Sequence, residues 1–78
     1  MNIEEFVQQF ASQFDEIPAS EFTAATLFRE NEEWSSMTAL SVIAMADENY
    51  AVRLTGEDIR QSSTIADIYQ IVYNKAHS

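Results

Sequence analysis

Residues 34–50 constrain the fold most, because this stretch contains neither glycine nor proline and places apolar residues at helical intervals. Its main apolar set has the i, i+3, i+4, i+7, i+11 spacing of the core-facing side of a helix. These residues are Ala39, Val42, Ile43, Ala46 and Tyr50. A shorter apolar set is offset from the first and consists of Met37, Leu40 and Ala44. We therefore predict a helix with one face buried inside the chain and another face available to a partner.

Ser35 and Ser36 stand at the start of this predicted helix. The first backbone N–H groups of a helix have no partner within the helix, so a serine at this point ordinarily caps it. A serine here can also be an attachment point, because the unpaired N–H groups and the positive end of the helix dipole favour a phosphate linked to the hydroxyl. Both roles are open for the two serines.

The beginning of the chain predicts a first helix followed by a break. Asn2 and Glu5 have the spacing of a capping box. The apolar residues that recur there at helical intervals are Ile3, Phe6, Val7, Phe10 and Phe14. We expect the helix to end near Phe14, with its phenylalanines in the core. The chain then breaks, because Pro18 disfavours helical backbone at Ile17.

Residues 20–33 carry a weaker pattern, which we interpret as a long connection with one turn of helix. Its end is acidic, with Glu30, Glu32 and Glu33 just before the central helix. Acid near a helix N-terminus is favourable, so these side chains are expected to stabilise the start of that helix.

Two short signals place the remaining helices. Thr55 with Asp58 and Thr64 with Asp67 have the spacing of helix caps, the first opening a short helix that carries Ile59. The last helix has a shared apolar face made of Ile65, Ile68, Tyr69 and Val72. Residues 51–54 are a connector whose inward-pointing residues are Val52 and Leu54.

The predicted fold is therefore all-α and forms a single domain over residues 1–78. We expect a small four-helix bundle with three longer helices and one short helix. A long loop separates the first and second helices.

The composition argues against several kinds of catalytic or metal site. The chain has no cysteine, so neither a disulfide nor a cysteine-ligated metal is possible. Its single histidine, His77, is next to the C-terminal end, where we expect a frayed backbone that cannot hold a Ser-His-acid triad. Residues 47–58 have acids at both ends, as a calcium loop does, but Val52 stands where such a loop needs glycine. With no glycine-rich phosphate loop either, we expect no enzyme and no metal site.

The charge balance points to protein partners. Thirteen acidic against four basic side chains give a formal net charge of −9, which repels nucleic acid and anionic lipid and attracts basic docking surfaces. No apolar run approaches the roughly 20 residues of a membrane span, and residues 1–5 are acidic where a signal peptide would be basic. We expect a cytoplasmic monomer that binds neither membrane nor nucleic acid.

These features together resemble the acyl carrier proteins, the small acidic helical bundles of fatty-acid and polyketide synthesis. The family motif Asp-Ser-Leu at the start of the second helix is matched here by Ser35-Ser36-Met37. The acidic and aromatic segment 47–50, the connector 52–54 and Thr64-Ile65 also sit at family spacing. The resemblance covers nearly the whole chain and is strongest over residues 33–72.

The resemblance implies a cofactor and a set of partners. By position, Ser36 would carry 4′-phosphopantetheine, transferred from coenzyme A by a phosphopantetheinyl transferase, and acyl groups would be bound to this arm as thioesters. Enzymes that load, condense or transfer acyl groups would dock through basic patches. The matching surface here comprises Ser35, Met37, Leu40, Ser41, Ala44, Asp47 and Glu48. Acyl chains of the family can slip between the helices, and the residues that would border such a chain here are the small Ala39 and Ala46 and the larger Ile43 and Ile68.

Two departures from the family pattern favour a specialised stand-alone carrier. The aspartate before the modified serine is Ser35 here, and Glu33 and Trp34 replace the upstream glycine. Trp34 could staple the start of the helix, or lie beside the arm and shape the choice of transferase. The departures also leave open a second hypothesis. The chain would then be an unmodified acidic helical adaptor that binds a protein through Met37, Leu40 and the nearby acids, with both serines serving as caps.

Overall fold

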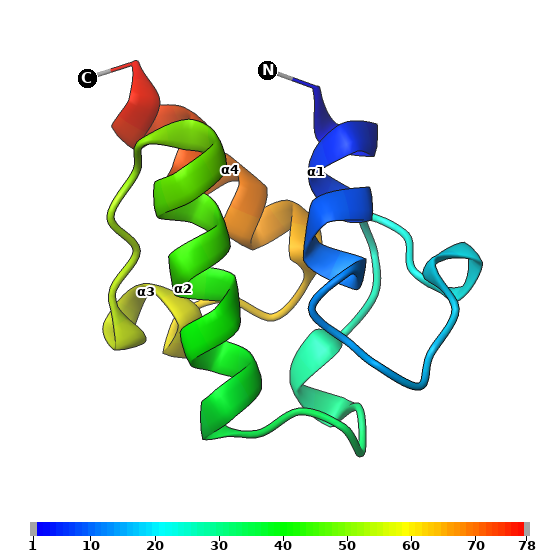
Figure 1. Ribbon diagram of the computed structural model, residues 1–78. Helices are drawn as coiled ribbons and strands as arrows, with labels where there is room; N and C mark the ends of the chain where they lie inside the picture. Colours follow the sequence, from blue (N-terminus) through cyan, green and yellow to red (C-terminus); the bar gives the residue numbers. More distant parts are fainter. Residues whose placement is uncertain (1, 78) are drawn as a thin grey trace.

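Helices supply the regular structure of residues 2–77, the part of the chain that this computed structural model describes (Figure 1). Three helices are longer: α1 (Ile3–Ala11), α2 (Ser36–Tyr50) and α4 (Ile65–Ala76). The helix α3 (Gly56–Arg60) is short, and the connection between α1 and α2 contains the 3₁₀ turns η1 (Ala19–Glu21) and η2 (Phe28–Glu30). The prediction of an all-α four-helix bundle with a long loop after the first helix is confirmed.

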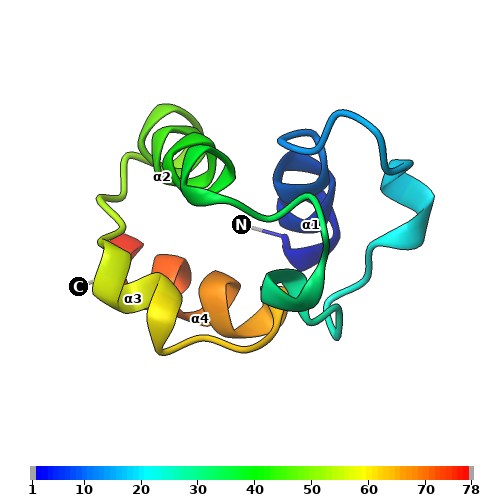
Figure 2. The same cartoon turned by 90° about the horizontal axis from the view of Figure 1, so that it is seen from below.

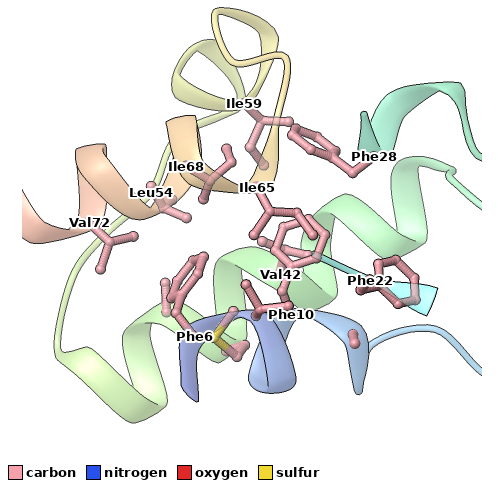
Figure 3. Close-up of a cluster of buried hydrophobic side chains, with 14 of the residues drawn as sticks. Phe6, Phe10, Phe22, Phe28, Val42, Leu54, Ile59, Ile65, Ile68 and Val72 are labelled. Atoms are coloured by element: carbon pink, nitrogen blue, oxygen red, sulfur yellow. The ribbon is translucent and has the colours of Figure 1, made fainter. Parts of the chain in front are cut away.

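A single cluster of buried apolar side chains joins the helices (Figure 3). Those with no exposed surface are Phe6, Phe10, Phe28, Val42, Ala46, Ile65, Ile68 and Val72. The rings of Phe10 and Phe28 meet edge to face with their centroids 5.3 Å apart, which ties η2 to α1. Full burial of one such side chain contributes about 1.5–3 kcal/mol, so this cluster is the main source of the stability of the bundle.

The helix starts follow the caps predicted from the sequence. The Asn2 side chain accepts a hydrogen bond from the Glu5 N–H at 3.1 Å. Thr55 and Thr64 each form a complete capping box, with Asp58 and Asp67 as the reciprocal partners. These signals act over three residues, which is why the sequence alone identifies them.

The first helix is shorter than predicted. It ends at Ala11 with Ser12 as its C-cap, and Phe14 lies in the turn that follows. Two bonds of 3₁₀ type continue the chain for one more turn, from the Gln13 N–H to the Phe10 carbonyl and from the Phe14 N–H to the Ala11 carbonyl. Because this turn keeps a near-helical spacing, Phe14 still reaches the core and is buried.

The long connection contains two 3₁₀ turns, where one helical turn was predicted. Its carbonyls accept hydrogen bonds from the first N–H groups of α4, Ile65 to Thr26 at 3.2 Å and Ala66 to Ala24 at 2.9 Å. The segment is therefore held by the unpaired donors of a helix start, which the local sequence pattern does not reveal.

Glu33 has a role that the sequence did not predict. Its carboxylate accepts hydrogen bonds from the backbone N–H groups of Asp15 at 2.7 Å and Glu16 at 3.2 Å, so it ties the two ends of the long connection together. The first turn of α2 contains no acidic residue.

The buried face of α2 is broader than the predicted stripe. Val42 and Ala46 are fully buried, as predicted, but Ala39, Ile43 and Tyr50 are only half-buried. Met45 and Thr38 lie outside the predicted stripe and are buried. The reason is that α2 packs against both α1 and α4, and two neighbours cover more of a helix than one apolar stripe.

Candidate functional site

The first turn of α2 holds the two serines in different environments. Ser35 is the N-cap, with extended backbone, and its Oγ accepts a hydrogen bond from the Thr38 N–H at 3.3 Å. The Thr38 hydroxyl donates in turn to the Glu33 carbonyl at 3.0 Å. Ser35 therefore satisfies the helix start, in one of the two roles that the sequence left open for the serine pair.

Ser36 is the first residue of α2, and its side chain is exposed. Within the described residues, its hydroxyl takes part in no hydrogen bond. Since Ser35 performs the capping, the Ser36 hydroxyl is not required for the helix and is available to a reagent from solution.

Trp34 fixes the direction from which the chain enters α2. Its ring stacks on Phe10 at 6.4 Å between centroids and meets Phe28 edge to face at 5.0 Å. It also stacks on Phe14 at 6.3 Å. These contacts anchor the ring to α1 and to the long connection, which the staple hypothesis did not include. The other hypothesis, that Trp34 lies beside an attached arm, stays a prediction.

A cleft of about 340 Å³ opens beside the two serines. The residues that line it come from the start of α2, from α3 and from η2. Figure 2 views the molecule from the end at which α2 begins. The lining residues of the cleft are Arg29, Trp34, Ser35, Ser36, Ala39, Gly56, Ile59 and Arg60. The lining therefore combines apolar residues with two serines and two arginines.

Both arginines of the cleft have a defined position. Arg29 donates from Nε at 3.0 Å and from Nη2 at 2.6 Å to the Ser62 carbonyl. Arg60 forms an exposed ion pair with Glu57, with 2.8 Å between Nη2 and Oε2. The hydrogen bond from Arg60, followed by one from Gln61, lowers the pKa of the Glu57 carboxyl below its usual value.

The position of these two arginines beside Ser36 was not predicted from the sequence. Arg60 lies 24 residues from Ser36 and Arg29 only seven, and both line the same cleft because η2 and α3 pack around the start of α2. The only signal available from the sequence was that cationic side chains are scarce, four in the whole chain.

The predicted partner surface follows the outer side of α2. Met37 is 76% exposed and Leu40 is 64% exposed, although both are large and apolar. Ala44, Asp47 and Glu48 are also exposed, while Ser41 is half-buried. The structure thus places these residues along one helix, next to Ser36 at its start.

The residues predicted to border an acyl chain do not all line the cleft. Ala39 lines the cleft, but Ala46 and Ile68 have no exposed surface and do not line it. Both belong to the cluster of buried apolar side chains.

His77 lies at the other end of the molecule from the start of α2. The C-terminal end of α4 and the start of α2 occupy opposite ends in Figure 1. The His77 ring stacks on Tyr73 with 4.2 Å between centroids, and its Nδ1 is 2.8 Å from the Tyr73 carbonyl oxygen. The fraying expected at this end of the chain stays a prediction.

The helices described here are all too short or too polar to cross a lipid bilayer. A scan against protein-family models gives no match, and searches of curated proteins and of solved structures give no significant match.

Proposed function

We propose that this chain is a carrier protein whose Ser36 hydroxyl receives 4′-phosphopantetheine from coenzyme A. The observation that carries the proposal is the division of roles between the two serines. Ser35 caps α2, and Ser36 presents an exposed hydroxyl at the first helical position. The family resemblance of the sequence motif supports the same residue.

The surroundings of Ser36 fit such a group. Its Oγ can form an ester with phosphate without loss of a helix cap, and the neighbouring cleft offers space beside the attachment point. The positive end of a long helix favours a negative group there. When attached, the arm would supply the thiol on which acyl groups are carried as thioesters, a group that this cysteine-free chain lacks.

The outer side of α2 supports a docking role. Large apolar side chains that are mostly exposed, such as Met37 and Leu40, are typical of contact sites for other proteins. Asp47 and Glu48 extend the same surface with negative charge. We propose that the apolar pair contacts partner enzymes with basic patches, including the transferase, and that the acids steer their approach. The proposed setting is the cytoplasm.

A second candidate function is favoured by the same exposed pair. Met37 and Leu40 could bind a protein partner without any arm on Ser36, in which case the chain would be an acidic helical adaptor. The two functions differ in one covalent step, so a mass measurement separates them.

The full chain is incubated with coenzyme A and a promiscuous phosphopantetheinyl transferase, and its intact mass is then measured. We expect the addition of one phosphopantetheine to the wild type. The addition should disappear in Ser36→Ala and persist in Ser35→Ala, the adjacent-serine control. A folded chain that gains no mass with any of several transferases would contradict the carrier function and favour the adaptor.

A further inference from the structure

We infer that Arg29 and Arg60 form an anion subsite that holds a phosphate ester on Ser36. For the phosphodiester of the arm this inference rests on the proposed function. The shared chemistry is a phosphate bonded to Ser36 Oγ, so a phosphoserine at this position would be held in the same way. In either case the phosphate lies in the cleft between α2, α3 and η2.

The distribution of charge is the first argument. The chain has a formal net charge of −9 and contains four basic side chains, two of which line the cleft beside Ser36. None of the residues that line it is acidic. A phosphate on Ser36 would be repelled by the protein as a whole, and these arginines supply local positive charge where it would be attached.

The bonding of Arg29 is the second argument. It donates through Nε and Nη2 to a single neutral acceptor, the carbonyl of Ser62. Ser62 is buried, and its hydroxyl is bonded to the Asp58 carbonyl at 2.9 Å. These bonds hold the guanidinium in place without pairing its charge with a carboxylate. A guanidinium has five N–H donors, so donors remain for a phosphate.

Arg60 completes the subsite from α3. Its partner Glu57 is exposed, and such surface ion pairs contribute little, so a phosphate can compete for the guanidinium. Its Nη1 lies 3.4 Å from the point that a Cβ on Gly56 would occupy. The guanidinium therefore lies close to Gly56, which itself lines the cleft.

The size and the lining of the cleft limit what it holds. About 340 Å³ is near the lower end of the roughly 300–1,000 Å³ of small-molecule pockets, so it suits a phosphate with the adjoining part of an arm. Trp34, Ala39 and Ile59 supply apolar contact for that adjoining part. An arm that leaves Ser36 through this cleft would keep clear of Met37 and Leu40 and leave them free for a partner.

Phosphoserine placed at Ser36 by genetic encoding tests the subsite without any transferase. Its second pKa, ordinarily about 6, is measured by ³¹P NMR in the full chain. Nearby cations favour the doubly charged form, so we expect Arg29→Gln and Arg60→Gln each to raise this pKa by about half a unit or more. The matched control is Arg53→Gln, which removes the same charge from an exposed side chain that does not line the cleft. This control should leave the pKa nearly unchanged.

The phosphopantetheinylated chain provides the second arm of the test. Attachment should shift the side-chain Nε–H resonances of Arg29 and Arg60 in ¹⁵N spectra, and the Arg53 resonance should stay in place. Arg60→Gln loses only an exposed ion pair, so it keeps the test valid if Arg29→Gln unfolds the chain.

The outcomes separate the two proposals. If the phosphoserine pKa in all three variants equals that of the chain with all its arginines, the subsite is overturned, even if transferases load the chain. A pKa raised only by the two cleft variants would support the subsite even if no transferase loads the chain, and the carrier function alone would then fail.

Discussion

The helices α2 and α4 begin in opposite ways. At α4, the Asp67 carboxylate accepts from the N–H groups of Ser63 at 2.9 Å and Thr64 at 3.0 Å, and Thr64 accepts from the Asp67 N–H. At α2 the cap is the neutral Ser35, and the first turn contains no acid. A carboxylate of the helix itself thus caps the start of α4, whereas the first turn of α2 supplies no carboxylate of its own.

The two starts also differ in what surrounds them. The first N–H groups of α4 are bonded to carbonyls of the long connection, through Ala24 and Thr26. The start of α2 faces a cleft with two arginines and an exposed hydroxyl. The start of α4 is therefore covered by hydrogen bonds from the rest of the chain, whereas the start of α2 is accessible to a reagent from solution.

The largest expected effect is on the anchoring of the start of α2. Trp34→Ala removes a ring that packs on Phe10, Phe14 and Phe28. Burying large aromatics contributes strongly, so the free energy of unfolding should fall by about 3 kcal/mol. Urea unfolding followed by circular dichroism measures this loss. A loss below 1 kcal/mol would mean that the aromatic contacts of Trp34 do not hold the start of α2 in place.

The two caps should be equal in strength although their surroundings differ. Ser35→Ala and Thr64→Ala each remove one accepting hydroxyl, and each should cost about 1 kcal/mol. Ser36→Ala should cost less than about 0.5 kcal/mol, because it removes an exposed hydroxyl without a role in the helix. Denaturant unfolding of the three variants compares them directly. A larger loss in Ser36→Ala than in Ser35→Ala would contradict the division of roles.

Low pH should weaken the cap at the start of α4 and leave the cap at the start of α2 unchanged. Hydrogen bonds from the N–H groups of Thr64 and Ser63 lower the pKa of Asp67 in the folded state. The ionised carboxylate therefore stabilises the fold above about pH 4, the usual range of an unfolded aspartate, and this contribution is lost as the pH falls through the lower folded pKa.

Unfolding curves at a series of pH values test this difference. Asp67→Asn should be less stable than wild type at pH 7, and the gap should narrow as the pH is lowered towards 3. Ser35→Ala should keep a constant gap, because the hydroxyl it lacks does not titrate. A gap for Asp67→Asn that is independent of pH would mean that its charge has no part in the cap.

The smallest expected effect comes from adding the missing acid. Met37→Glu places a carboxylate in the first turn of α2 on an exposed side chain. It should raise the free energy of unfolding of the unmodified chain by about 0.5 kcal/mol through the helix dipole. High salt should remove the gain. A loss of stability at low salt would show that the start of α2 does not favour negative charge.

The sequence predicted those parts of the molecule that depend on neighbours along the chain. The caps at Thr55 and Thr64 and the exposed pair Met37 and Leu40 follow from spacings within one or two turns. It also predicted Ser36 as the candidate attachment site, and that role stays a prediction. Short-range hydrogen bonds and helical periodicity suffice for such features.

The sequence did not predict features that arise from packing between distant segments. The bonds of Glu33 to Asp15 and Glu16 join segments that no local pattern relates. The cleft likewise brings Arg60 of α3 beside Ser36, which is 24 residues away in the chain. Helical periodicity relates only residues that are a few positions apart, so contacts between such separate segments are seen only in the folded structure.

The central claim is that Ser36 carries a phosphopantetheine arm. Fragmentation mass spectrometry of the intact protein, purified from the cells that make it, tests this claim most directly because it locates the added mass on one residue. The account predicts a phosphopantetheine, with or without an acyl group, on Ser36. An unmodified Ser36 throughout the native population, or the group on another residue, would contradict it.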